Sequence, residues 1–168
     1  MKKEKIVTMN INVAQILYEI QNNSHIIAEQ TLNNENDNFE RAANMQPTEE
    51  NELQLINRYI NIALAECTEM LFPYTKEEIV DSDINCNTGA DVYSMALTLP
   101  NDFSMTTVTL LRNLIPEYVV CRALANWMSV ANPAIQEIWG IKCREVKNKI
   151  QSALLSRVGK MKRRLKPF

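Results

Sequence analysis

The fold is decided by the stretch YVVCRALANWMSVA, residues 118–131, which is apolar almost all the way round a helix. Its polar side chains recur four and three positions apart and so form one narrow stripe, Arg122, Asn126 and Ser129. A helix with so little polar surface is typical of the buried centre of a domain. We expect it to begin near Ser104, with Pro116 either kinking it or starting a second helix.

Apolar residues at helical spacing predict three further helices, over residues 12–31, 49–71 and 133–158. Asn10 or Asn12 can cap the first and Thr48 the second, because short polar side chains accept hydrogen bonds from the free amides of a first turn. The dipeptide Asn132-Pro133 separates the central helix from the last one. Glycine is scarce, with 3 residues in 168, which also favours helices. The sequence therefore predicts a mainly α fold, a bundle of four to five helices.

One segment has the period of a strand. Residues 92–99 alternate between two sets of side chains and end at Pro100, which is tolerated at a strand end or edge. A turn signal precedes them at residues 87–89, so residues 78–84 are the expected partner. This predicts one small β-hairpin over residues 84–99, which needs helices or another subunit to stabilise it.

Two polar segments are expected to extend from the bundle. Residues 32–47 are rich in asparagine and predict a polar loop that only Phe39 and Met45 could hold down. Residues 159–168 predict a basic C-terminal tail, so the fold includes extended terminal arms. The length fits a single domain over residues 1–168.

The net charge of −2 conceals a strong asymmetry. Residues 1–5 carry +2, residues 6–140 carry five basic and eighteen acidic side chains, and residues 141–168 carry ten basic side chains and one glutamate. An acidic body with a basic end can steer an anionic partner to one place or pair subunits head to tail. The simpler alternative is a solvated basic helix face.

The cysteines are interpreted as reduced core residues of an intracellular protein, because their spacing fits no zinc or redox motif: Cys67, Cys86, Cys121 and Cys143. The basic start is not followed by the apolar region of a signal peptide. No apolar run approaches the ~18 residues that a membrane span needs. We therefore expect a protein that is made in a cytosol and makes no membrane contact.

No catalytic constellation is legible in the sequence. His25 is the only histidine, and the three glycines lie too far apart to cradle a phosphate. Carboxylate pairs such as Glu66 and Glu69 are interpreted as solvated faces, since nothing nearby in the sequence would separate their pKa values. We expect no catalytic residue, no cofactor and no metal, and a structural role rather than an enzyme.

Arg122 has two interpretations. It can bind an anion or a partner's carboxylate at a subunit interface, because a guanidinium matches such groups. Alternatively, it lies on a surface stripe or forms a structural pair with a glutamate of residues 49–69.

The C-terminal tail is the strongest functional feature of the sequence. Its basic side chains can meet phosphate or an acidic neighbour, while its apolar residues anchor it in a pocket. The alternative is a solubilising end with no partner. The candidate partner-binding residues, in addition to Arg122, are Lys160, Lys162, Arg163, Arg164, Lys166 and Phe168.

Residues 93–168 resemble the small helical head–tail connector (adaptor, or ring) proteins of tailed bacteriophages, including those of crAss-like phages. The resemblance covers a strand, an apolar helix, a second helix opened by proline, and a basic tail. The residues that carry it are Leu97-Thr98-Leu99-Pro100, Asn101-Asp102-Phe103, Glu117-Tyr118, Trp127, Pro133, Trp139 and Pro167-Phe168.

The resemblance implies a structural virion protein, assembled in the host cytoplasm. Such subunits form a homo-oligomeric ring, commonly twelve-fold, that docks between the portal and the tail or a neighbouring ring, and DNA in the channel can be contacted without sequence preference. Two alternatives stay open. One is a small helical nucleic-acid-binding or packaging protein that uses the basic C-terminal end; the other is an enzyme or adaptor whose site forms only between subunits.

Overall fold

The computed structural model describes residues 4–34, 42–75, 92–101 and 103–155. The described part is mainly helical, with five helices and two antiparallel strands, so the predicted fold class is confirmed. In chain order the elements are β1 (Glu4–Asn12), α1 (Val13–Asn34), α3 (Glu50–Met70), α4 (Phe72–Thr75), β2 (Val92–Pro100), α5 (Met105–Ala131) and α6 (Pro133–Leu155).

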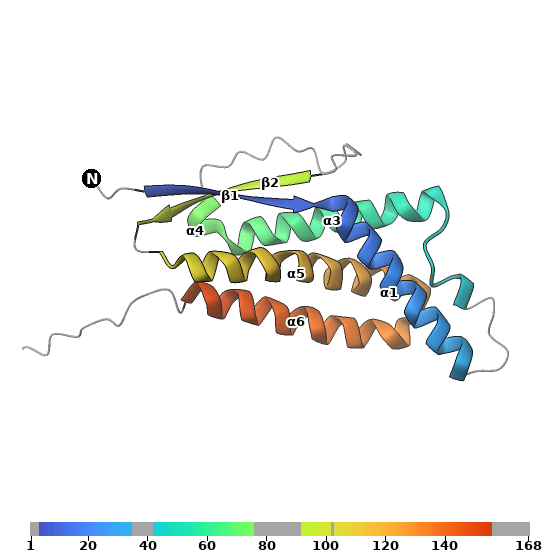
Figure 1. Cartoon of the computed structure of the whole chain (residues 1–168). Helices are drawn as coiled ribbons and strands as arrows, with labels where there is room; N and C mark the ends of the chain where they lie inside the picture. The colour runs from blue at the N-terminus through green and yellow to red at the C-terminus, as the bar shows by residue number, and fades with distance from the viewer. Residues whose placement is uncertain (1–3, 35–41, 76–91, 102, 156–168) are drawn as a thin grey trace, which may run out of the picture.

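Helix α5 runs through the middle of the molecule, between α3 on one side and α6 on the other (Figure 1). It is one continuous helix with Pro116 inside it, so the proline does not start a second helix. Ser104 is its N-cap, and the Ser104 hydroxyl accepts from the Thr107 amide. Residues on every side of α5 are buried, which confirms the prediction of a central helix.

Helix α3 packs on α5 through a buried stripe, Ile56, Ile60, Ala63, Leu64 and Cys67. Its N-cap is Glu49 rather than the predicted Thr48. Glu49 and Glu52 form a reciprocal capping box, in which the Glu52 carboxylate accepts from the Thr48 and Glu49 amides at 2.8 and 3.0 Å. The Glu52 carboxylate, at the third helical position, reaches back to amides at the start of the helix that have no partner within it.

The predicted strand is present as β2, and among the described residues it pairs with a strand far from it in the sequence. β2 pairs with the N-terminal strand β1, antiparallel, with Val7 opposite Leu97 and Met9 opposite Met95. Those side chains are buried on the helices, and the alternate residues face outward. The segment 78–84 and the turn at residues 87–89 lie outside the described residues.

Helix α1 begins after Asn12, whose side chain accepts from the Gln15 amide at 3.0 Å, so the cap at Asn12 is confirmed. It continues to Asn34, past the expected end at residue 31 and into the predicted polar loop. At the other end of that loop Met45 is fully buried, and its carbonyl accepts from the Trp127 indole at 2.8 Å. The core therefore anchors the segment that leads into α3.

Helix α6 follows Asn132-Pro133 as predicted and packs mainly on α5. Only a narrow stripe of it is buried: Cys143, Val146, Ile150 and Ala153. The structure describes α6 to Leu155, so the expected end near residue 158 and the tail at residues 159–168 lie outside the described part. No helix within the described ranges is both long enough and apolar enough to span a membrane.

Candidate functional site

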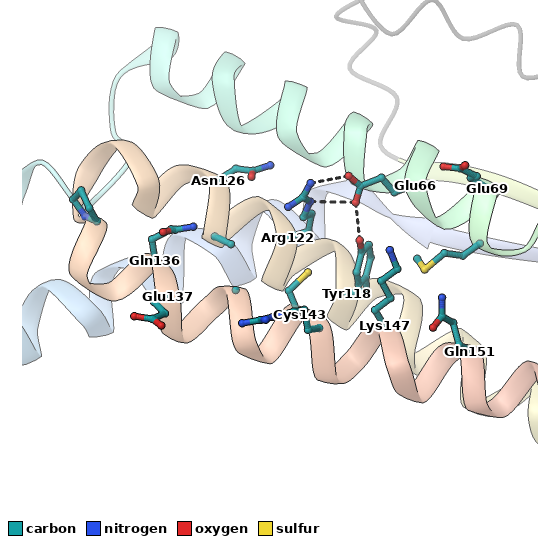
Figure 2. A pocket seen from close by; sticks show the side chains of 15 residues that line it. Glu66, Glu69, Tyr118, Arg122, Asn126, Gln136, Glu137, Cys143, Lys147 and Gln151 are labelled. Atoms are coloured by element: carbon teal, nitrogen blue, oxygen red, sulfur yellow. Dashed lines mark hydrogen bonds and ion pairs between the residues drawn. The ribbon is translucent and has the colours of Figure 1, made fainter.

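A groove of about 890 Å³ runs along α5 between α3 and α6 (Figure 2). Its floor is the polar stripe of α5 that the sequence predicted, with Arg122 and Asn126 facing the opening. Helix α3 contributes Glu66 and Glu69 to one wall, and the side chains of α6, among them Lys147, form the other. The groove therefore brings charged side chains of three helices together in a molecule whose centre is apolar.

Glu66, Tyr118 and Arg122 form a hydrogen-bonded cluster in this groove (Figure 2). The Arg122 guanidinium donates two hydrogen bonds to the Glu66 carboxylate, from Nη2 to Oε1 at 2.8 Å and from Nε to Oε2 at 3.1 Å. The Tyr118 hydroxyl donates to Oε2 at 2.6 Å. A bidentate arginine–carboxylate pair is the strongest geometry available to this ion pair, so the cluster ties α3 to α5.

The cluster shifts the pKa values of its members. Burial alone would raise the pKa of Glu66, but the hydrogen bonds from Arg122 and Tyr118 and the charges of Arg122 and Lys147 lower it overall. Burial and the bond to Glu66 raise the pKa of Tyr118. Its bond to Glu66 also raises the pKa of Arg122, against the effect of burial. At pH 7 Glu66 is therefore ionised, the Tyr118 hydroxyl keeps its proton and Arg122 is positively charged.

This arrangement corrects one prediction and decides between two others. Glu66 was interpreted as a solvated carboxylate, yet it is partly buried and its pKa is tuned by neighbours on two other helices. Arg122 forms the structural pair with a glutamate of residues 49–69, the second of its two interpretations. The Nε and Nη2 atoms of Arg122 are bonded to Glu66, so a partner's carboxylate would have to compete with that pair.

The groove also contains one of the four cysteines. Cys143 lies on its wall, but burial raises the pKa of that thiol, so little thiolate forms at neutral pH. The thiols of Cys67 and Cys121 are also buried and free, with the pKa of Cys121 raised by burial to about 11. Three cysteines are thus buried core residues as predicted, and Cys86 lies outside the described part. Among the described residues no group of three or more His, Cys, Asp or Glu side chains could hold a metal ion.

A second groove, of about 490 Å³, lies on the other flank of α5, between the start of α1 and α6. It is lined by charged and amide side chains, including Glu19, Arg112 and Lys142. The ammonium of Lys142 lies 5.0 Å from the centre of the Trp139 ring on the same helix. Because each side of α6 borders a groove, α5 is the only described element with which this helix shares an extensive contact.

The tail residues of the predicted partner site cannot be placed beside Arg122. Lys160, Lys162, Arg163, Arg164, Lys166 and Phe168 all lie outside the described residues. His25 is half exposed, 3.4 Å from Glu29 on the same helix, and its Nδ1 accepts from the Gln46 side-chain amide at 3.0 Å. The sequence did not identify Tyr118 as a member of the groove. Its hydroxyl bonds to Glu66, and that contact follows only from the crossing of α3 over α5.

No family model, curated protein or solved structure matches this chain. The resemblance to head–tail connectors therefore rests on the residues quoted above, and the function it implies stays a prediction.

Proposed function

We propose that the protein is a non-catalytic structural subunit of a virion, a head–tail connector that forms a ring between portal and tail. The support is a helical scaffold of the predicted class, together with the resemblance of residues 93–168 to that family. In this proposal the helices α3, α5 and α6 are the rigid body, and the basic tail at residues 159–168 binds a neighbouring subunit, the portal or the next ring.

The observation that carries the proposal is the separation of charge along the bundle. Helix α3 has four glutamates and one arginine, and α1 has two glutamates and no lysine or arginine. Helix α6 has four basic side chains and two glutamates, and it ends directly before the most basic segment of the chain. Opposite charges on different faces of one subunit favour a head-to-tail contact, the type that generates rings when the rotation closes.

The test is direct imaging of the purified chain, alone and mixed with a phage portal encoded beside it, together with native mass measurement. A closed ring, or a stoichiometric complex with the portal, is the expected result. A chain that stays monomeric when saturating portal is present would contradict the proposal. Deleting residues 159–168 should abolish docking to the portal while leaving the helical content unchanged.

The alternative function, a small nucleic-acid-binding or packaging protein, draws on the same basic end. Lys142 and Lys149 are exposed on α6 and lead towards the basic tail. Binding of this kind is dominated by phosphate contacts, so the affinity for duplex DNA of any sequence would fall steeply with salt. A monomer or dimer with such salt-dependent DNA binding, and no portal complex, would favour this alternative over the connector.

A further inference from the structure

Helix α6 carries a second stripe on the face that points away from α5. Its members recur at alternating spacings of four and three residues and are all exposed: Ala134, Ile138, Ile141, Glu145, Asn148, Ser152 and Leu155. At about 100° per residue these positions fall opposite the buried stripe that packs on α5. We call this set the outer stripe of α6.

The outer stripe is more apolar than a solvated helix face needs to be. Ile138 is 65 % exposed, Ile141 45 % and Leu155 77 %. The alternating spacing is that of a helix seam that packs along another helix. By contrast, no large hydrophobic side chain on α3 is among the exposed ones. The outer stripe therefore has the spacing of a helix seam and exposes large apolar side chains on either side of Glu145, Asn148 and Ser152.

The charges beside the outer stripe indicate what can pack on it. Lys142, Arg144 and Lys149 are exposed next to the stripe, which itself contains one carboxylate, Glu145, whereas Lys147 lines the groove beside Glu66. Two copies of α6 would therefore place like charges against each other, which disfavours a symmetric pairing of this helix with itself. The occupant should present acidic and apolar side chains together.

Helix α1 presents that combination. Its outward face shows Tyr18, 67 % exposed, and Ile26, 43 % exposed, about two turns apart on the same side. Glu29 continues this face and Glu19 flanks it, and α1 has no lysine or arginine to oppose them. We call Tyr18, Asn22, Ile26 and Glu29 the outer face of α1. Helices α1 and α3 are both acidic, but of the two only α1 exposes large apolar side chains.

We propose that the outer stripe of α6 in one copy of the chain packs on the outer face of α1 in a second copy. Ile138 and Ile141 meet the apolar side chains of α1, and Lys149 meets Glu29, eleven residues further along each helix. The contact joins two different surfaces, so each subunit has one of each left to bind a further copy. This inference rests on the proposed function and deepens it, since it assigns the subunit contact of the ring.

The apolar part of the contact is tested with the full chain by sedimentation velocity over a concentration series. The double variant Ile138→Glu/Ile141→Glu should weaken self-association by at least about tenfold, the effect of removing central interface side chains. The matched control is Ala65→Glu, which adds a carboxylate to an exposed position of α3, on the other side of α5 (Figure 1). Thermal unfolding of each variant shows that it is folded.

The polar part is tested by exchanging charges. Lys149→Glu and Glu29→Lys should each weaken self-association, and the two changes together should restore it, because the pair is then reversed rather than broken. Wild-type chain that remains monomeric at the highest attainable concentration, a double Glu variant that associates like wild type, or a charge exchange without recovery would each overturn the inference.

The outcome separates this inference from the proposed function. The chain could assemble through the outer stripe into an open filament, or into a ring that no portal binds. Either result would support the subunit contact and contradict the connector function. A ring that docks on a portal and still forms in the double Glu variant would support the connector function and contradict the subunit contact.

Discussion

Helices α5 and α6 lie side by side and have similar lengths, 27 and 23 residues, yet the structure uses them differently. Helix α5 buries thirteen of its residues and contacts α1, α3 and α6, whereas α6 buries four and packs mainly on α5. The first helix holds the domain together. The second adds a surface to it. Substitutions in the two helices should therefore differ in what they damage, stability in α5 and association in α6.

The largest effect is expected at Leu124, which is fully buried in the middle of α5. Leu124→Ala should destabilise the fold by about 2–5 kcal/mol, because it removes buried methyl groups and leaves a cavity. Leu124→Met keeps the volume and should cost less than about 1.5 kcal/mol. Urea unfolding of both variants measures the two values. Equal costs would contradict the tight packing around α5.

The next largest effect concerns Trp127, whose indole donates to the Met45 carbonyl. Trp127→Phe leaves that buried carbonyl without its donor and should cost about 1–3 kcal/mol. The amides of Met45 and Gln46, which bond to Ala42 and Ala43, should exchange faster with solvent. Trp139→Phe is the matched change on α6. It should leave the exchange of those two amides unaltered, and an equal acceleration would argue against the anchor.

The ion pair between α3 and α5 should have a smaller effect that depends on pH. The folded-state pKa of Glu66 is lowered, so its ionised form stabilises the fold above its unfolded pKa, and this contribution is lost as pH falls through the folded-state pKa. Glu66→Gln should cost about 1–2 kcal/mol at pH 7, since the pair is partly exposed to solvent.

The difference in unfolding free energy between wild type and Glu66→Gln should shrink as the pH falls below 4.5, the ordinary pKa of the carboxyl group. Glu69→Gln changes an exposed residue of the same helix and serves as the control. A constant difference from pH 7 to pH 2 would show that the ion pair does not stabilise the fold.

The smallest effect on stability is expected at the outer stripe of α6. Ile141→Ala should change the unfolding free energy of the monomer by no more than about 0.5 kcal/mol, because the side chain is already exposed to water. Ile150→Ala on the buried side of the same helix should cost about 2–4 kcal/mol. Measured at a concentration where the chain is monomeric, similar costs for both would remove the distinction between the two faces.

The sequence was most informative where one short segment contains its own signal. The apolar surround of residues 118–131, the alternation that became β2 and the break at Asn132-Pro133 each depend on neighbours within a few positions. The alternation of Val7, Met9 and Ile11 with polar residues was an equally local signal for β1. The turn signal at residues 87–89 favours a nearer partner for β2, and the two signals conflict.

The Glu66 cluster could not be reached in the same way. Arg122 stood out as a charge on an apolar helix, and a glutamate of residues 49–69 was one of its candidate partners. Which glutamate it binds depends on the crossing of α3 over α5, and so does the contribution of Tyr118. Met45 was recognised as a possible anchor, but its burial depends on where the end of α1, α5 and the start of α6 converge.

The sequence by itself determined where the four long helices lie, which of them is central, and that basic charge gathers towards the C-terminal end, because periodicity and composition are local properties. Tertiary structure alone decided that an N-terminal strand completes the sheet and that Glu66 binds Arg122 and Tyr118. It also decided that α6 turns one side to α5 and leaves an apolar stripe outside. These contacts join residues tens of positions apart, and only the packing of the whole chain selects them.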